Sequence, residues 1–394
     1  MLNFDFLVPT RLIFGRDTQR QVGALVAGYG GRKALLHYGG GSVKRTGLYD
    51  QVTESLREAG VAFVELGGVV PNPRLELVYE GIELCRKEGV DFILAVGGGS
   101  VIDSAKAIGV GVCTDIDIWD FYEKGLPVAK TLPVATILTI PAAGSETSMS
   151  SVITNEEKEM KYGLDVEEIR PVFSIINPEL FFTLPIEQMA YGTADIMSHI
   201  MERYFTTTIG TDLTDGLCEA TLKATMKNAL VLMKDMNNYE AWAQLGHCGS
   251  MAHTNILGLG RVQEWSCHPM EHELSALYDV AHGAGLAALT PAWMEYVYRE
   301  NVPMFVQFAV NVMGVEGSFR EPEAIARQGI LRLRGFFDSL GLPATLKDMG
   351  IGTDKLEYMA SKATGAEYGD ENPLGCIKPL YRQDVLEIYK SIAG

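Results

Sequence analysis

This sequence has no apolar run long enough to cross a membrane. A membrane-spanning helix needs about 18 consecutive apolar residues, and no segment of the 394-residue chain approaches that length. The N-terminal MLNFDFLVPTRLIFG has an acidic residue where a secretory signal is basic, and no small-residue cleavage site follows. We therefore expect a soluble, cytoplasmic protein with no membrane partner.

Cysteine and basic residues are also scarce. The six cysteines are scattered without a CxxC pair, which argues against a disulfide framework and favours reduced thiols. Lysine and arginine number 33 against 50 aspartates and glutamates, so the formal net charge is −17. This charge repels phosphate backbones at long range, and we expect no nucleic-acid partner.

The chain is long enough for two domains, and its pattern changes near the middle. Five apolar runs are typical of strands buried on both faces of a mainly parallel sheet: 33–41, 61–66, 91–100, 132–140 and 172–178. After Pro185, apolar residues recur at three- and four-residue steps without comparable strand runs. We expect an α/β domain over 1–184 and an all-helical domain over 185–394.

A glycine-rich turn after the strand 91–97 favours a nucleotide site. Gly98, Gly99 and Ser100 precede a helix that we place from about Val101, and unshielded amides at a helix start suit a pyrophosphate. Asp103 can cap the free amides or hold a cofactor hydroxyl or amide. A tight strand-to-helix turn without a ligand explains a single glycine triplet equally well. The segment 136–148, also after a predicted strand, is a candidate floor for the site.

The earlier turn Gly39-Gly40-Gly41-Ser42 bears on the choice of cofactor. Proteins that select NADH often place a carboxylate at the end of an early strand, where it holds the ribose and repels a 2′-phosphate. This chain has glycine amides, a serine hydroxyl, Lys44 and Arg45 there instead. These are donors suited to an additional phosphate, so we expect NADPH. The alternative is that both cations are merely solvated at a helix start.

Histidine is scarce but clustered, with seven in the chain and five of them between residues 247 and 282. Asp195 and His199 are four apart in a helical stretch, so their side chains share one face. His268 and His282 could reach the same centre. One carboxylate and three imidazoles suit Fe(II) or Zn(II), in a site that is either catalytic or structural.

Other residues near these motifs have open roles. Cys267 and His253 are the main rival ligands. His272 lies four after His268 on the same helical face, and is either a proton-handling group or a packed polar residue. The aromatic and apolar side chains that either line a substrate pocket or belong to the core are Trp119, Phe121, Trp265 and Met270.

With these residues placed, the chain resembles the iron-containing (group III) alcohol dehydrogenases, in particular their NADPH-dependent butanol dehydrogenase and aldehyde reductase branch. The resemblance spans essentially the full length, and its motifs are FGRDT at 14–18, PNP at 71–73, GGGSVIDSAKAI at 97–108, AAGSE at 142–146, ADIMSHIMERYF at 194–205 and HPMEHELSALYDVAHGAGLA at 268–287. It implies an α/β dinucleotide-binding domain, an all-α metal-binding domain, the dehydroquinate synthase-like architecture and a homodimer.

The resemblance also assigns site residues. It implies the metal ligands Asp195, His199, His268 and His282. It implies the cofactor contacts Gly39, Gly40, Gly41, Ser42, Asn72, Gly98, Gly99, Ser100, Asp103, Thr139, Lys161 and Thr183. Family members that prefer NADH carry aspartate in place of Gly39, which supports the NADPH expectation. The segment 138–148 departs from the threonine- and glycine-rich form common in the family.

The expected activity is metal-dependent, NADPH-linked reduction of short- to medium-chain aldehydes to primary alcohols. The metal polarises the carbonyl, the nicotinamide C4 delivers hydride, and a proton arrives through water, a ribose hydroxyl or His272. The first alternative is a polyol or glycerol dehydrogenase, or a dehydroquinate synthase-like lyase, on the same architecture. The second is a nucleotide-binding or redox-sensing module without catalysis.

Overall fold

The computed structural model describes residues 1–317, 320–369 and 371–394. The chain divides into two compact units. The first, here the α/β unit, comprises Leu7–Leu184 and Asn237–Ser250. The second, the helical unit, comprises Met1–Phe6, Pro185–Met236 and Met251–Gly394.

A six-stranded sheet in the order β1-β8-β5-β4-β2-β3 is the centre of the α/β unit, and all its pairings are parallel. Its strands are β1 Arg11–Phe14, β2 Lys33–Gly39, β3 Ala62–Val69, β4 Phe92–Gly97, β5 Val134–Leu138 and β8 Phe173–Ile176. Every residue of β4 and β5 is buried, because helices cover both faces. The α/β prediction is confirmed, although the sequence did not reveal β1.

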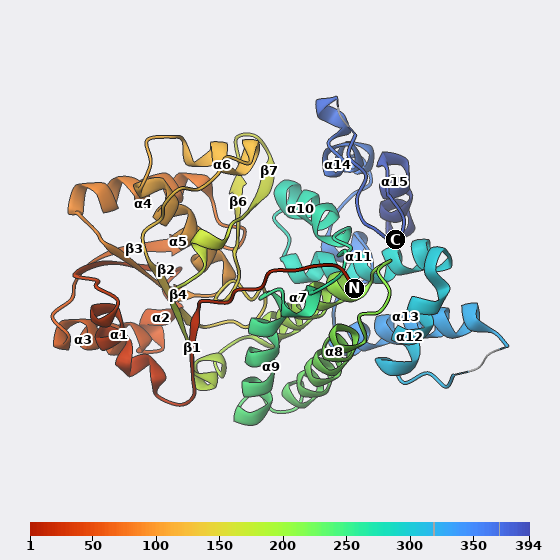
Figure 1. Cartoon of the computed structure of the whole chain (residues 1–394), viewed down its shortest axis with the longest axis horizontal. Coiled ribbons are helices and arrows are strands. Elements are labelled where there is room, and N and C mark those ends of the chain that lie inside the picture. The colour runs from red at the N-terminus through yellow and green to blue at the C-terminus, as the bar shows by residue number, and fades with distance from the viewer. Residues whose placement is uncertain (318–319, 370) are drawn as a thin grey trace. The chain divides into compact units, whose positions relative to one another are not determined.

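Helices α1 (Val22–Gly28) and α3 (Leu48–Glu58) lie on one side of this sheet, and α4 (Leu75–Glu88) and α5 (Gly99–Val112) lie on the other (Figure 1). The apolar residues of α1 and α3 pack with the strands into one core. Shorter helices connect them: η1 Thr18–Gln21, α2 Ser42–Arg45, α6 Ile118–Lys124, η2 Glu167–Ile169 and η3 Pro178–Phe181.

A separate antiparallel hairpin, which the sequence did not reveal, joins β6 (Ser150–Asn155) to β7 (Met160–Asp165). The Ser151 hydroxyl donates to the carbonyl oxygen of Asp103 at 2.9 Å, which ties the hairpin to α5. Glu159 in the turn has φ 51°, a conformation that glycine usually adopts. Because the turn lacks glycine, its sequence carries no hairpin signal.

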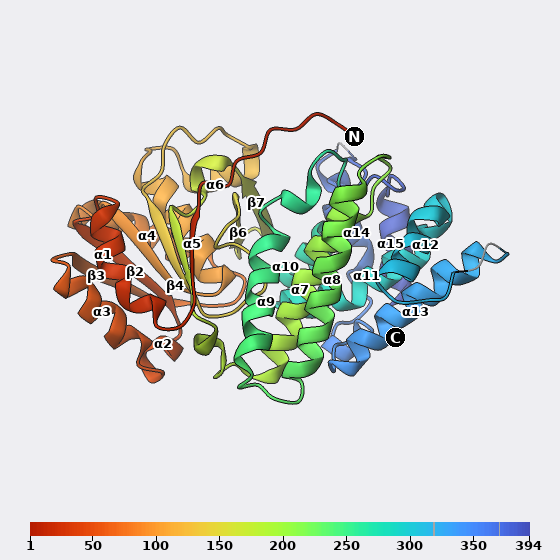
Figure 2. The same cartoon turned by 60° about the horizontal axis from the view of Figure 1, so that its bottom comes forward.

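The helical unit contains no strand among its described residues. Its main helices are α7 Ile186–Tyr204, α8 Asp212–Leu232, α10 Cys267–Tyr278, α11 His282–Val297, α12 Val302–Asn311, α13 Pro322–Ser339, α14 Leu356–Ala363 and α15 Arg382–Ser391. Helices α7 and α8 lie side by side (Figure 2). The prediction of an all-α second half is confirmed. None of the described helices has the length and apolar content needed to span a membrane.

Two segments group differently from the predicted division at 184/185. Most of α9 (Tyr239–Ala252) belongs to the α/β unit, because Trp242 packs on Phe181 with ring centroids 5.5 Å apart, and Ser250 donates to Glu146 at 2.5 Å. Residues 1–6 belong to the helical unit, where the amide of Leu2 donates to the carbonyl oxygen of Gly260. Such packing leaves no periodic signal in the sequence.

Candidate metal centre and cofactor site

Asp195 and His199 lie one turn apart on α7, and both are buried. The Nδ1 atom of His199 lies 3.0 Å from the Asp195 carbonyl oxygen, to which it hydrogen-bonds, and 2.9 Å from Asp195 Oδ1. Arg203, one turn further, donates to the His199 carbonyl oxygen at 2.9 Å. The i, i+4 spacing therefore fixes both side chains on the same face of the helix.

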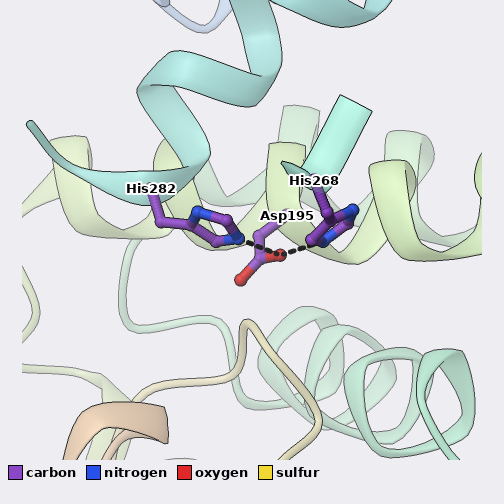
Figure 3. A group of neighbouring side chains, drawn as sticks. All are labelled: Asp195, His268 and His282. Carbon is purple, nitrogen blue, oxygen red and sulfur yellow. Dashed lines mark ion pairs between the residues drawn. The ribbon is translucent and has the colours of Figure 1, made fainter. Parts of the chain in front are cut away.

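His268 in the first turn of α10 and His282 at the start of α11 converge on Asp195. Each Nε2 atom lies 3.9 Å from Asp195 Oδ1, and Figure 3 shows both rings directed at that oxygen. A Cβ on Gly283 would lie 2.0 Å from the Tyr191 carbonyl oxygen, so only glycine lets α11 come this close to α7.

These distances fit a metal ion better than direct hydrogen bonds. A separation of 3.9 Å is too long for a hydrogen bond, but it suits two donors that each lie about 2.0 to 2.2 Å from one ion. Asp195 Oδ1 and His268 Nε2 are buried and lack a hydrogen-bond partner within the described part of the chain. The donor set of carboxylate and imidazole fits Fe(II) or Zn(II).

His199 lies beside this group. The compact donor group contains Asp195, His268 and His282, and the ring of His199 has its centroid 4.3 Å from that of His268. A second donor group of Glu271, His272 and His282 shares one histidine with the first. Of the four ligands that the resemblance implies, the structure thus gathers three and places the fourth in ring contact with them.

The protonation states of Asp195 and His199 suit metal ligands. Burial acts to raise the pKa of Asp195, but the nearby imidazoles, His199 first, outweigh it and hold the pKa well below its usual range. Burial lowers the pKa of His199 to about 4. An ionised carboxylate and a neutral imidazole are the forms in which these side chains ligate metals.

Two carboxylates that the sequence analysis missed contact this group. Glu202 hydrogen-bonds Nδ1 of His268, and Glu271 hydrogen-bonds Nδ1 of His282. Both carboxylates are buried. Glu202 and His268 are 66 residues apart, so no spacing rule connects them. Glu271 lies three residues after His268, but its partner is on the next helix.

The rival ligands have other partners. His253 contacts Arg203 Nη2 through Nδ1 at 2.8 Å and lies with its ring 4.4 Å from that of His199. Cys267 is fully buried, and burial raises its pKa well above the usual value for a thiol. Neither is in a donor group within the described residues.

Of the candidate pocket residues, Trp265 lies beside the donor group, with its ring 5.3 Å from that of His268. Its φ of 49° is a strained conformation for a bulky residue. Met270, Trp119 and Phe121 are buried in the core. The indole of Trp119 stacks on Tyr122 and on Tyr162.

The candidate cofactor residues lie in the α/β unit, most of them beyond the carboxyl ends of its strands. Gly39 ends β2, Gly98 follows β4 and Thr139 follows β5, and these three strands are neighbours in the sheet. Helix α5 begins at Gly99, two residues earlier than predicted, with Gly98 as its N-cap. Gly98, Gly99 and Ser100 are half-buried, so the helix start is accessible.

The remaining cofactor candidates differ in their burial and in the elements that carry them. Asn72, with φ 53°, is buried in the loop after β3, and Lys161 is buried on β7. Thr183 is exposed after η3. Asp103 accepts hydrogen bonds from the Ser145 hydroxyl at 2.5 Å and the Val152 amide at 3.0 Å. Its carboxylate therefore already holds the loop and the hairpin around the helix start.

The turn after β2 presents cations and no free carboxylate. Gly41, with φ 100°, is the N-cap of α2, and Ser42 and Arg45 are exposed. Lys44 donates to Glu65 at 3.1 Å. The same carboxylate accepts hydrogen bonds from Tyr38 and Tyr49, so its charge is engaged by three donors.

Comparisons with known proteins agree along the whole chain. The sequence profile described as "Iron-containing alcohol dehydrogenase" matches residues 9–178. The profile described as "Fe-containing alcohol dehydrogenase family, C-terminal" matches residues 189–393. NADH-dependent butanol dehydrogenase A of Clostridium acetobutylicum is 45% identical over 391 residues, which are 99% of each chain.

More distant relatives and solved structures give the same result. NADPH-dependent aldehyde reductase YqhD of Escherichia coli is 33% identical over 92% of this chain and 93% of its own length. The crystal structure of NADH-dependent butanol dehydrogenase A from Thermotoga maritima matches with a TM-score of 0.95 and 41% identity, and it covers 100% of this chain and 99% of that one.

Proposed function

This chain belongs to the iron-containing alcohol dehydrogenase family, and on that premise we propose that it reduces aldehydes to primary alcohols with NADPH. The observation that carries the proposal is the convergence of His268 and His282 on Asp195, where Asp195 Oδ1 and His268 Nε2 are buried without a hydrogen-bond partner among the described residues.

The chain's own residues prepare the reaction. Asp195, His268 and His282 would hold Fe(II) or Zn(II), with His199 as the adjacent fourth ligand. When bound, the metal supplies Lewis-acid polarisation of a carbonyl oxygen, and the nicotinamide supplies hydride. The amides of Gly98 to Ser100 at the start of α5 bind and orient a pyrophosphate.

We assign the proton-handling role to His272. It lies one turn after His268 on α10, is half-buried, and has its ring 5.7 Å from that of His282. His272→Asn is expected to lower kcat by about 100-fold, the usual scale of general acid catalysis, with an unchanged Kd for NADPH. Steady-state kinetics and a fluorescence titration check both, and an unchanged kcat removes His272 from the proton path.

The NADPH preference rests on the turn after β2. Its half-buried and exposed residues offer glycine amides, the Ser42 hydroxyl, Lys44 and the exposed Arg45. The nearby Glu65 pairs with Lys44 and accepts hydrogen bonds from Tyr38 and Tyr49. The names of the relatives divide on this point, since butanol dehydrogenase A, 45% identical, is NADH-dependent and YqhD, 33% identical, is NADPH-dependent. The local charge favours the 2′-phosphate.

Gly39→Asp tests this preference. A carboxylate there is expected to lower kcat/KM for NADPH at least about tenfold by like-charge repulsion, with a smaller effect for NADH. A Cβ at this position would lie 3.2 Å from the Val69 carbonyl oxygen, so the larger side chain itself perturbs the turn. Gly39→Asn is the matched control, because it adds the same bulk without charge. Equal losses in both variants contradict the charge argument.

The proposed activity has a direct test. Anaerobically purified protein, either metal-free or loaded with Fe(II) or Zn(II), is mixed with butanal and NADPH or NADH, and the loss of reduced cofactor is followed by absorbance. Metal-dependent consumption that favours NADPH is the expected result. No consumption with either cofactor and either metal contradicts the reductase proposal and favours a lyase or a sensor on this fold.

We also propose a cytoplasmic homodimer. The expectation comes from the resemblance and from a chain whose described helices do not span a membrane. Light scattering on the purified protein measures the mass in solution, and a mass equal to one chain contradicts the dimer.

A further inference from the structure

In His268 and His282, both ring nitrogens face a carboxylate. In His268 and His282 the Nε2 atom faces Asp195 Oδ1, and the opposite nitrogen, Nδ1, hydrogen-bonds a carboxylate. That carboxylate is Glu202 for His268 and Glu271 for His282. Both carboxylates are buried, with exposed fractions of 1% and 0%.

This arrangement places a proton on Nδ1 of each ring. A carboxylate accepts hydrogen bonds, so Nδ1 donates, and in the neutral imidazole Nε2 keeps its lone pair. In each ring that lone pair faces Asp195. The anionic partner also makes the imidazole more basic and therefore a stronger metal donor. His199 achieves the same tautomer differently, through the Asp195 carbonyl oxygen at 3.0 Å from its Nδ1 atom.

The two carboxylates link the three helices that carry the donors. Glu202 belongs to α7 and holds the histidine of α10, and Glu271 belongs to α10 and holds the histidine of α11. Glu202 Oε1 also accepts the backbone amide of Cys267 at 2.5 Å, at the start of α10. A Cβ on Gly285 would lie 2.7 Å from Glu271 Cγ, so α11 approaches Glu271 only with glycine there.

The charges on Asp195, Glu202, Glu271 and Arg203 balance when a dication is present. Asp195, Glu202 and Glu271 contribute three negative charges, all buried. Arg203, also buried, contacts the group through the His199 carbonyl oxygen and contributes one positive charge. A divalent ion supplies the other two charges. Buried carboxylates are costly without such compensation, so the two glutamates and the ion stabilise one another.

We infer that Glu202 and Glu271 are positioning residues, which set the tautomer and basicity of His268 and His282 and thereby the affinity of the site for its metal. The inference rests on the proposed function, because it assumes an ion between Asp195 and these rings. It predicts that both glutamates control metal binding without touching the ion.

Zn(II) binding by the full-length chain tests the inference. The metal-free protein is titrated with Zn(II) against a chromophoric chelator. Glu271→Ala is expected to weaken Zn(II) binding about 10- to 100-fold, the usual cost of losing such a partner. Glu271→Gln keeps an acceptor but loses the charge, so its loss is expected to be smaller. The same titration applies to Glu202→Gln, which keeps the acceptor for the Cys267 amide and so preserves the start of α10.

Glu273→Gln is the matched control. Glu273 is a buried carboxylate on the same helix, but its partner is Lys362 at 3.2 Å. Its replacement is expected to lower the melting temperature and leave the Zn(II) affinity unchanged. Visible absorption of the Co(II)-loaded protein is a second readout, because the ligand field responds to the two site variants and not to the control.

The outcomes separate this inference from the proposed function. If the unaltered protein binds no Zn(II), the proposed metal site itself is wrong. If it binds Zn(II), and the variants of Glu202 and Glu271 match it in affinity and Co(II) spectrum, the positioning role is overturned. If His272→Asn weakens binding and Asp195→Asn does not, the ion occupies the Glu271, His272 and His282 group, and Glu271 is a ligand instead.

Discussion

His37 is a fully buried histidine in the middle of β2, far in the sequence from the other six. Its Nδ1 donates to the Leu66 carbonyl oxygen at 2.8 Å, and Nε2 lies 2.9 Å from the Ser104 hydroxyl. Burial lowers its pKa from 6.5 to about 4. As pH falls below 6.5, the unfolded chain binds a proton that the folded chain does not, so stability falls with pH until about 4.

The expected loss from His37 between these two pH values is about 3 kcal/mol. Urea unfolding of the unaltered protein and of His37→Asn, measured across this range, tests it: the variant is expected to show a shallower fall in the free energy of unfolding toward acid. His247→Asn, which replaces an exposed histidine, is the control and is expected to keep the original slope. Parallel slopes for all three proteins contradict the prediction.

At the scale of single residues, the sequence indicated the candidate metal ligands but not the carboxylates that hydrogen-bond them. Asp195 and His199 were identifiable because a helix makes residues four apart neighbours. Glu202 was not, because on a helix such a residue is usually solvated and its partner lies 66 residues away. Contacts between helices depend on how the helices pack, which no local pattern encodes.

At the scale of elements, Lys106 of α5 anchors the loop that follows β5. Its buried Nζ donates to the carbonyl oxygens of Ser145 at 2.7 Å, Ser148 at 3.1 Å and Ser150 at 2.7 Å. Lys106→Met removes the donor for all three oxygens, so we expect the free energy of unfolding to fall by about 3 kcal/mol or more. Urea denaturation followed by circular dichroism measures this change.

Lys33→Met is the matched control for the Lys106 prediction. The Lys33 side chain is 31% exposed and pairs with Glu88 at 2.7 Å near the surface. A partly exposed ion pair contributes at most about 1 kcal/mol, so this variant is expected to lose much less stability. Equal losses in the two variants would show that the loop does not depend on Lys106.

The sequence predicted some strands of the α/β unit and missed others. The buried strands β2, β4 and β5 were predictable because their apolar runs have strand length and end at glycine or a polar turn. The hairpin β6–β7 was not, since Ser150, Ser151 and Thr154 are polar and its turn contains no glycine. Its strands are held by pairing with each other and by the contact with α5, which a sequence window does not contain.

At the scale of the whole molecule, the candidate residues separate cleanly between the two units. The metal group lies in the helical unit, and the cofactor candidates lie in the α/β unit. The sequence indicated this separation through the change of pattern near Pro185. It did not indicate that residues 237–250 group with the α/β unit, because α9 has the same helical period as its neighbours.

Hydrogen exchange followed by mass spectrometry tests whether the metal binds to the helical unit and the cofactor to the α/β unit. A ligand in excess stabilises the structure that binds it, by about 4 kcal/mol at a thousand times its Kd. Zn(II) is therefore expected to slow exchange in α7, α10 and α11, which carry the donor group. NADPH is expected to slow exchange at Gly39–Ser42 and Gly98–Ser100.

Asp195→Asn is the control, because it should abolish the response to Zn(II) and keep the response to NADPH. Slowing by Zn(II) at the glycine turns alone, with α7, α10 and α11 unchanged, contradicts the assignment of the metal to the helical unit.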